Sequence, residues 1–168
     1  GCRGTAPACQ EVFSVDGNLI QGIIMVVLLV MSAFFSATET SFSALNRTRL
    51  KNMAEKGNKR AEAALKLAEN YDSLLSSILV GNNIVNISMA SIGTVMFVNL
   101  LGSSSGPTVS TIVCTVVVLI FGEITPKSVA KEMPENFAMA VTPVMRVLLV
   151  VLKPINAVFS GWKKLLCR

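Results

Sequence analysis

The sequence predicts an all-α membrane protein made of three transmembrane helices and an amphipathic juxtamembrane helix. Its 168 residues are 52% hydrophobic, with a mean hydropathy of +0.61. Residues 73–122 form a run of fifty residues without one Asp, Glu, Lys, Arg or His. A crossing needs about 20 apolar residues, so this run is long enough for two crossings and a connector. A buried soluble core is the competing interpretation, but soluble domains rarely extend so far without a charge.

The charges argue against two other classes of protein. The chain has fifteen Lys and Arg residues and ten Asp and Glu residues, but the basic residues cluster beside apolar spans. With one Tyr and one Trp there is no interleaving of aromatic and basic residues, so we expect no nucleic-acid partner. The absence of His excludes the usual zinc and histidine chemistries. An intramembrane enzyme with Glu123 and Lys127 as acid and base is the weaker alternative, because no nucleophile with a paired base is evident; we therefore expect no enzyme.

The N-terminal residues 1–16 are expected to be an extracytoplasmic segment or a tag remnant. They show no signal-peptide pattern, since no basic start precedes an apolar stretch. Of the four cysteines only Cys2 and Cys9 are close enough to suggest a local disulfide. Residues 17–168 are expected to form one transmembrane domain.

The first span is predicted at about residues 19–45 and carries a polar stripe. Positions three and four apart share a helix face. The stripe contains Ser32, Ser36, Glu39, Thr40 and Ser43. Lipid offers these groups no hydrogen-bond partner, so the stripe should face protein or water. Hydroxyl groups that help close helix packing are the alternative explanation.

The basic connector at 46–72 orients the protein. It carries seven Lys and Arg against four Asp and Glu, and Gly57-Asn58 should divide it into two short helices. Short basic connectors lie on the cytoplasmic side. We therefore expect a multi-pass protein of the cell membrane, with its N-terminus outside and its C-terminus in the cytoplasm.

The second and third spans are predicted at about 74–101 and 108–131, joined by a turn-forming cluster at 102–107. Asn82 and Asn86 are four residues apart and share a face, and Asn83 lies beside them. Each carboxamide carries an acceptor oxygen and two N–H donors, which are costly in a membrane unless they have partners. A hydrogen bond that holds a dimer together is the competing interpretation.

The third span supplies a carboxylate in Gly122-Glu123-Ile124-Thr125-Pro126-Lys127. Pro126 has no N–H, and its ring clashes with the carbonyl of Gly122. We expect a free carbonyl oxygen beside Glu123, a combination that suits a hard cation. Neutralisation of Glu123 by Lys127 is the alternative.

The last apolar stretch, about 136–164, is interrupted by Pro143, Arg146, Lys153 and Pro154. Its polar residues fall on one helical face, which favours a juxtamembrane helix in the interface over a fourth crossing.

The polar groups of the three spans are all hydroxyl, amide, carbonyl or carboxylate oxygens. Such a set suits Mg²⁺, Ca²⁺ or Mn²⁺, and Na⁺ by the same hardness argument. The spacing does not choose between Mg²⁺ and Na⁺.

The three motifs in this order resemble the transmembrane domain of the CorC/CNNM (cyclin M) magnesium transporters. They are Ser32-Ala-Phe-Phe-Ser36-Ala-Thr-Glu39-Thr, Gly81-Asn82-x-x-x-Asn86, and Gly122-Glu123-Ile-Thr-Pro126-Lys127. Family members often carry Gly where this chain has Ala37. The resemblance implies a homodimer in the lipid bilayer with an inward-open cavity that binds Mg²⁺, and Mg²⁺ export coupled to sodium influx.

The resemblance also implies the residues of the site. Those at the ion would be Ser32, Ser36, Asn82, Gly122 and Glu123, supported by Glu39, Asn83, Asn86, Pro126 and Lys127. Members carry cytoplasmic CBS domains that bind ATP, which we expect to be absent from these 168 residues. The alternative function is a membrane anchor and Mg²⁺ sensor that signals to such a domain without transport.

Overall fold

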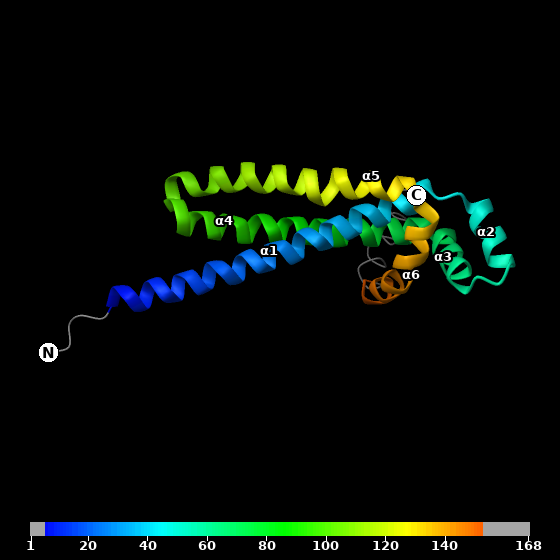
Figure 1. Cartoon of the computed structure of the whole chain (residues 1–168), viewed down its shortest axis with the longest axis horizontal. Coiled ribbons are helices and arrows are strands. Elements are labelled where there is room, and N and C mark those ends of the chain that lie inside the picture. The colour runs from blue at the N-terminus through cyan, green and yellow to red at the C-terminus, as the bar shows by residue number, and fades with distance from the viewer. Residues whose placement is uncertain (1–5, 153–168) are drawn as a thin grey trace, which may run out of the picture.

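The computed structural model describes the backbone of residues 6–152 and the side chains of residues 17–152 (Figure 1). Within this range the chain is helical apart from short connections. The elements are α1 (Ala6–Ala44), α2 (Arg47–Glu55), α3 (Lys59–Glu69), α4 (Tyr71–Val117), the π-helix η1 (Val118–Ile124), α5 (Thr125–Glu132) and α6 (Pro134–Val151). Three helical segments, 17–44, 71–132 and 134–151, are long and apolar enough to cross a membrane. The predicted all-α membrane fold is confirmed. The side chains of Cys2 and Cys9, and residues 153–164 of the predicted juxtamembrane helix, lie outside the part of the chain that the structure describes.

The segment from α4 to α5 folds back on itself as a helical hairpin (Figure 1). The reversal begins at Gly102, whose φ of 82° and ψ of 168° are not helical. Beyond it, a Cβ on Gly106 would lie 2.7 Å from the Cα of Val98. The two arms pack closely at Gly93, where a Cβ would lie 2.6 Å from the Sγ of Cys114. The reversal therefore falls in the predicted connector, and glycine lets the two arms approach each other.

Helix α1 lies obliquely along this hairpin and packs on both arms (Figure 1). Phe35 is buried against Gly81, where a Cβ would lie 2.6 Å from the ring. The opposite face of α1 leaves large aliphatic side chains exposed, among them Ile23, Val26 and Val30. Because such side chains are stable in hydrocarbon, this face is the lipid-facing one.

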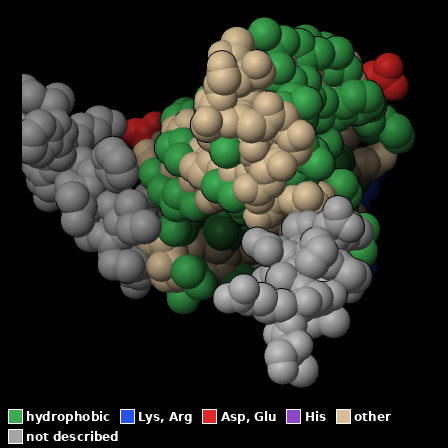
Figure 2. All heavy atoms as spheres, turned by 90° about the vertical axis from the view of Figure 1, so that its left-hand side faces the viewer, with side chains coloured by type: hydrophobic (Ala, Val, Ile, Leu, Met, Phe, Trp, Pro, Cys, Tyr) green, Lys and Arg blue, Asp and Glu red, His purple; other side chains and the backbone are tan. Residues whose placement is uncertain are grey.

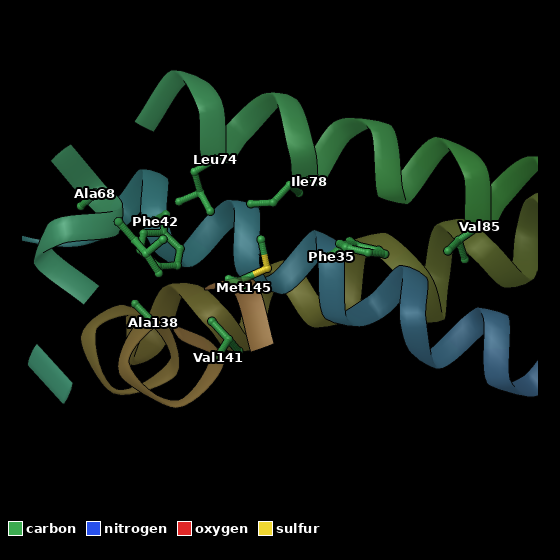
Figure 3. Packing of buried hydrophobic residues seen from close by; sticks show 10 residues of the cluster. Phe35, Phe42, Ala68, Leu74, Ile78, Val85, Ala138, Val141 and Met145 are labelled. Atoms are coloured by element: carbon green, nitrogen blue, oxygen red, sulfur yellow. The ribbon is translucent and has the colours of Figure 1, made fainter. Parts of the chain in front are cut away.

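The main hydrophobic core lies at the end of the bundle opposite the hairpin turn, where α1, α3, α4 and α6 meet. Figure 3 shows side chains from all four helices pointing toward one another; the fully buried ones include Leu74, Ile78 and Met145. Helix α6 begins two residues before the predicted 136 and crosses this end of the hairpin (Figure 1). Length and hydropathy alone make α6 a third candidate span. Its packing across α1 and α3 instead favours the predicted juxtamembrane position.

The connector between the first two spans forms two short helices, as predicted. Gly57, with a φ of 89°, separates them, and the side chain of Asn58 caps α3 by accepting from the backbone N–H of Ala61. On the exposed face of α3, Lys66 donates a 2.7 Å hydrogen bond to Glu62. That hydrogen bond and the charge of Lys66 hold the pKa of Glu62 below its usual value.

Candidate cation site

The centre of the candidate site is a serine that joins two helices. Ser32 on α1 is completely buried. Its hydroxyl lies 2.8 Å from Oδ1 of Asn86 and 3.2 Å from Oδ1 of Asn82, both on α4. A hydroxyl has only one proton to donate, so the two acceptors share it. Asn82 is the more distant acceptor, so its Oδ1 can accept a further hydrogen bond or bind a cation.

Ser36 lies one turn further along α1 and has no partner within the described residues. It is 1% exposed, and its Oγ is buried without a hydrogen bond. Leaving a buried hydroxyl unpaired costs about 1–3 kcal/mol. Native structures rarely leave such a group unsatisfied unless a ligand or water completes it. The hydroxyl of Ser36 is therefore available to a ligand.

Gly122 brings the third span to the same place. A Cβ on this buried glycine would lie 3.1 Å from Oγ of Ser32, so any side chain here would crowd the serine. Gly122 lies in the π-helix η1, where the N–H of Thr125 donates to the carbonyl of Ile120, five residues back. Pro126 follows and cannot donate to the carbonyl of Gly122. The helix therefore widens at this point and does not end, and single π turns are frequent at functional sites. The free carbonyl of Gly122 stays a prediction.

Glu123 follows Gly122 directly and is half-buried. The alternative in which Lys127 neutralises Glu123 is wrong. The Nζ of Lys127 lies 3.7 Å from Oε2 of Glu39 on α1, and no ion pair joins it to Glu123 within the described part of the chain. Among residues 17–152, no Lys or Arg side chain lies within ion-pair distance of the Glu123 carboxylate.

The remaining predicted residues fall into two groups. Asn86 joins the site through Ser32, whereas Asn83 is exposed on another face of α4. Glu39 and Lys127 pair with each other about one turn away from Ser36 and Glu123. Among the described residues no three His, Cys, Asp or Glu side chains converge, so a cation here would depend mainly on neutral oxygens.

The sequence-based prediction missed a cleft between the hairpin arms. Its volume is about 230 Å³. It is lined by Asn86, Ala90, Thr94, Ser110, Thr111, Cys114, Thr115, Val118 and Leu119. Thr111 and Thr115 are four residues apart, a spacing that places both on one helical face and that could have indicated this lining.

Comparison with known proteins assigns the family. Residues 23–168 match the description "Cyclin M transmembrane N-terminal domain". The chain is 42% identical over 133 residues, 79% of its length, to a UPF0053 protein of Haemophilus influenzae. It is 37% identical over 138 residues, 82% of its length, to the UPF0053 inner membrane protein YfjD of Escherichia coli. A chloroplastic DUF21 domain-containing protein of Arabidopsis thaliana is 35% identical over 140 residues, 83% of the chain. The matched parts are 31%, 32% and 21% of those relatives.

Proposed function

Because the chain belongs to the cyclin M transmembrane domain family, we propose that it is the ion-transporting domain of a magnesium transporter. In this proposal a partly dehydrated Mg²⁺ binds between α1, the first arm of the hairpin and η1. Its ligands are the hydroxyls of Ser32 and Ser36, the Oδ1 of Asn82, the carbonyl of Gly122 and the carboxylate of Glu123. Mg²⁺ leaves the cell, and sodium influx drives the export.

The observation that carries the proposal is the buried, unpartnered hydroxyl of Ser36. It lies on the same face of α1 as Ser32, whose proton goes to the asparagines. A serine that donates its proton still has oxygen lone pairs, so Ser32 can bind a cation and keep its bond to Asn86. A cation would thus satisfy Ser36 without breaking an existing hydrogen bond.

The charge of the site suits reversible binding. Mg²⁺ prefers six oxygen ligands and gives up its water reluctantly. One carboxylate and several neutral oxygens therefore bind it weakly, as transport requires. Because all the ligands are oxygen, the site also disfavours the softer transition metals.

The assembly and orientation are part of the same proposal. The basic α2–α3 connector places that end of the bundle in the cytoplasm, with the N-terminus outside. We propose a homodimer in the cell membrane, connected in the full-length protein to cytoplasmic CBS domains, since the matched relatives are about three to five times longer than the matched part.

Magnesium flux in proteoliposomes tests the proposal. Glu123→Gln removes the site's charge and Asn82→Ala removes a ligand, so both should abolish flux into liposomes loaded with a Mg²⁺-sensitive dye. The control is Asn83→Ala, which changes the exposed neighbour and should leave flux intact. Unchanged flux in both site variants would remove these residues from the ion path. Mg²⁺ binding without flux in the unmodified protein would instead indicate the sensor alternative.

A further inference from the structure

Helix α6 uses one of its faces to hold the two connector helices. Glu135 accepts a 3.4 Å hydrogen bond from the backbone N–H of Asn46, the N-cap of α2. One turn later, the Sδ of Met139 accepts from Nδ2 of Asn58, the N-cap of α3, at 3.8 Å. Arg146 lies seven residues after Met139, a spacing that returns to the same side of a helix. This face of α6 therefore brings Arg146 to the side on which α3 packs.

Exposed cations gather where α3 meets α6, and we call Lys59, Lys66 and Arg146 the cationic junction. Lys59, Glu62 and Lys66 are three and four residues apart and form one exposed stripe of α3. The pKa of Glu62 is lowered first by Lys66 and then by the charges of Arg146 and Lys59. Exposed charges act in this way only at short range, since salt screens them beyond about 10 Å. Among residues 17–152, no carboxylate lies within ion-pair distance of Lys59 or Arg146, and Glu69 at the end of α3 pairs with none of the three cations.

A second face of α6 is aliphatic and exposed. Val144, Val147 and Val151 are 53%, 65% and 64% exposed, and their spacing of three and four residues makes them one valine stripe. On a helix of 3.6 residues per turn, this stripe is offset by about 120° from the face of Met139 and Arg146. The hydrophobic core takes a third face, at residues 138, 141 and 145. The valine stripe is therefore turned away from both the connector and the core.

The position of α6 in the molecule brings both features to one edge of the membrane. Helix α6 crosses the bundle where α1 and α5 end (Figure 1), which is the level of the headgroups of one leaflet. Figure 2 looks onto the opposite end, at the hairpin turn, where the visible side chains are mostly hydrophobic or uncharged and charged ones appear only at the margin. An acidic protein or a nucleic acid would match the cations but would leave the valine stripe in water. A molecule with an anionic head and apolar chains matches both features.

We propose that the cationic junction and the valine stripe together bind an anionic phospholipid of the leaflet that contains α6. The headgroup phosphate lies at Arg146, Lys59 and Lys66, and the acyl chains lie along the valine stripe. Each basic side chain at an anionic lipid surface favours binding by about fivefold. The carboxylate of Glu62 opposes this attraction from within the cluster. The inference goes beyond the proposed function and does not depend on Mg²⁺ transport.

Native mass spectrometry of the detergent-purified full chain, without Mg²⁺, tests the lipid site. The probes are phosphatidylglycerol and phosphatidylcholine with the same acyl chains, and we expect the first bound lipid to be phosphatidylglycerol with a preference of at least about tenfold. Arg146→Gln should lower that preference about fivefold, whereas Glu62→Gln should raise it. Lys51→Gln is the matched control, because it removes one exposed charge from α2 and should leave the preference unchanged. Val147→Asn should weaken the binding of both lipids alike, since it changes the contact with the chains.

Three results would overturn the lipid site. Equal loss of preference in Arg146→Gln and Lys51→Gln would mean that overall charge attracts the lipid. Displacement of phosphatidylglycerol by an equal concentration of glycerol phosphate would mean that a free anion is the ligand. Disulfide formation between two copies at Val147→Cys, with the four native cysteines replaced by alanine, would mean that a second copy covers the valine stripe. Because Mg²⁺ is left out, these failures leave the proposed function untouched, whereas the cation site fails if Mg²⁺ does not stabilise the unmodified protein.

Discussion

Two neighbouring parts of α1 contain the same residue types, equally buried, but use them differently. In residues 38–41, Thr38, Thr40 and Ser41 each donate to a carbonyl four residues back in the same helix. In residues 32–36, Ser32 donates across to α4 and Ser36 donates to no residue that the structure describes. All five hydroxyl residues are less than 9% exposed. Burial of a hydroxyl in a membrane helix therefore does not identify a site; the destination of its hydrogen bond does.

This difference separates helix packing from ligand binding. A serine that bonds its own helix is satisfied before any ligand arrives. A serine without a partner is satisfied only by a ligand or water, and it keeps an oxygen pointed into the bundle. The two parts of α1 should therefore respond in opposite ways to the same substitution, both in stability and in Mg²⁺ affinity.

Among the changes in α1 and its immediate contacts, the largest expected effect comes from Ser32→Ala. The change removes one cation ligand and the donor shared by Asn82 and Asn86. Stability without Mg²⁺ should fall by about 1–3 kcal/mol, the cost of unsatisfied buried acceptors. The Kd for Mg²⁺ should rise by about tenfold or more. Isothermal titration and denaturation in detergent measure the two effects, and a change in stability alone would make Ser32 a packing residue like Ser41.

Gly122→Ala should have the next largest effect. The added Cβ would lie 3.1 Å from Oγ of Ser32, so the serine or η1 must move. Overpacking of this kind costs about 1–3 kcal/mol, and displacement of Ser32 should weaken Mg²⁺ binding. Gly22→Ala is the matched control on α1, where nothing lies within 4 Å of an added Cβ. Equal effects of the two changes on Mg²⁺ affinity would contradict close contact at Gly122.

Comparing Ser36→Ala with Ser41→Ala tests directly whether the two parts of α1 differ in function. Removing the unpartnered Ser36 hydroxyl should leave Mg²⁺-free stability unchanged or raise it, while the affinity for Mg²⁺ falls several-fold. Removing the Ser41 hydroxyl, which donates to Ala37 at 2.8 Å, should cost up to about 1 kcal/mol and leave Mg²⁺ affinity unchanged. Thermal unfolding with and without Mg²⁺ measures both the stability and the Mg²⁺ affinity. Equal changes in the two variants would show that Ser36 and Ser41 have the same role.

The smallest effect is expected at the Glu39–Lys127 pair. Both side chains are partly exposed, 29% and 38%, and such pairs contribute up to about 1 kcal/mol. Because they lie about one turn from the site, Lys127→Met should tighten Mg²⁺ binding slightly and Glu39→Gln should weaken it. Raising the ionic strength should shrink both effects. Effects of the same sign in the two variants would show that they act through structure and not through charge.

Much of this arrangement was predictable from the sequence. The four-residue spacings of Ser32 with Ser36 and of Asn82 with Asn86 place each pair on one helix face, and the structure packs those faces together at Ser32. The turn near Gly102 followed from the break in apolar composition, and the confirmed fold followed from the charge-free run. These features depend on local periodicity and transfer energies, which a single sequence contains.

Other features depend on how the helices are rotated against one another. Pro126 indicated an irregular helix, but the π-helix over Val118–Ile124 depends on packing against α1. Lys127 could have reached Glu123 or Glu39, and only the relative rotation of α1 and α5 selects Glu39. The lack of a described partner for Ser36 and the cleft between the hairpin arms likewise arise from the distances between helices. The sequence offered no signal that Ser36 would lack a hydrogen-bond partner.

The most direct test of the cation site is a Mg²⁺ titration of thermal unfolding on the purified protein and on its Glu123→Gln variant. A ligand that binds only the folded state stabilises it by mass action, about 2.7 kcal/mol at a hundred times its Kd. We predict a Tm that rises with Mg²⁺ in the unmodified protein and does not change in the variant. An equal rise in both proteins, or none in the unmodified one, would contradict binding at the junction of Ser32, Ser36, Asn82, Gly122 and Glu123.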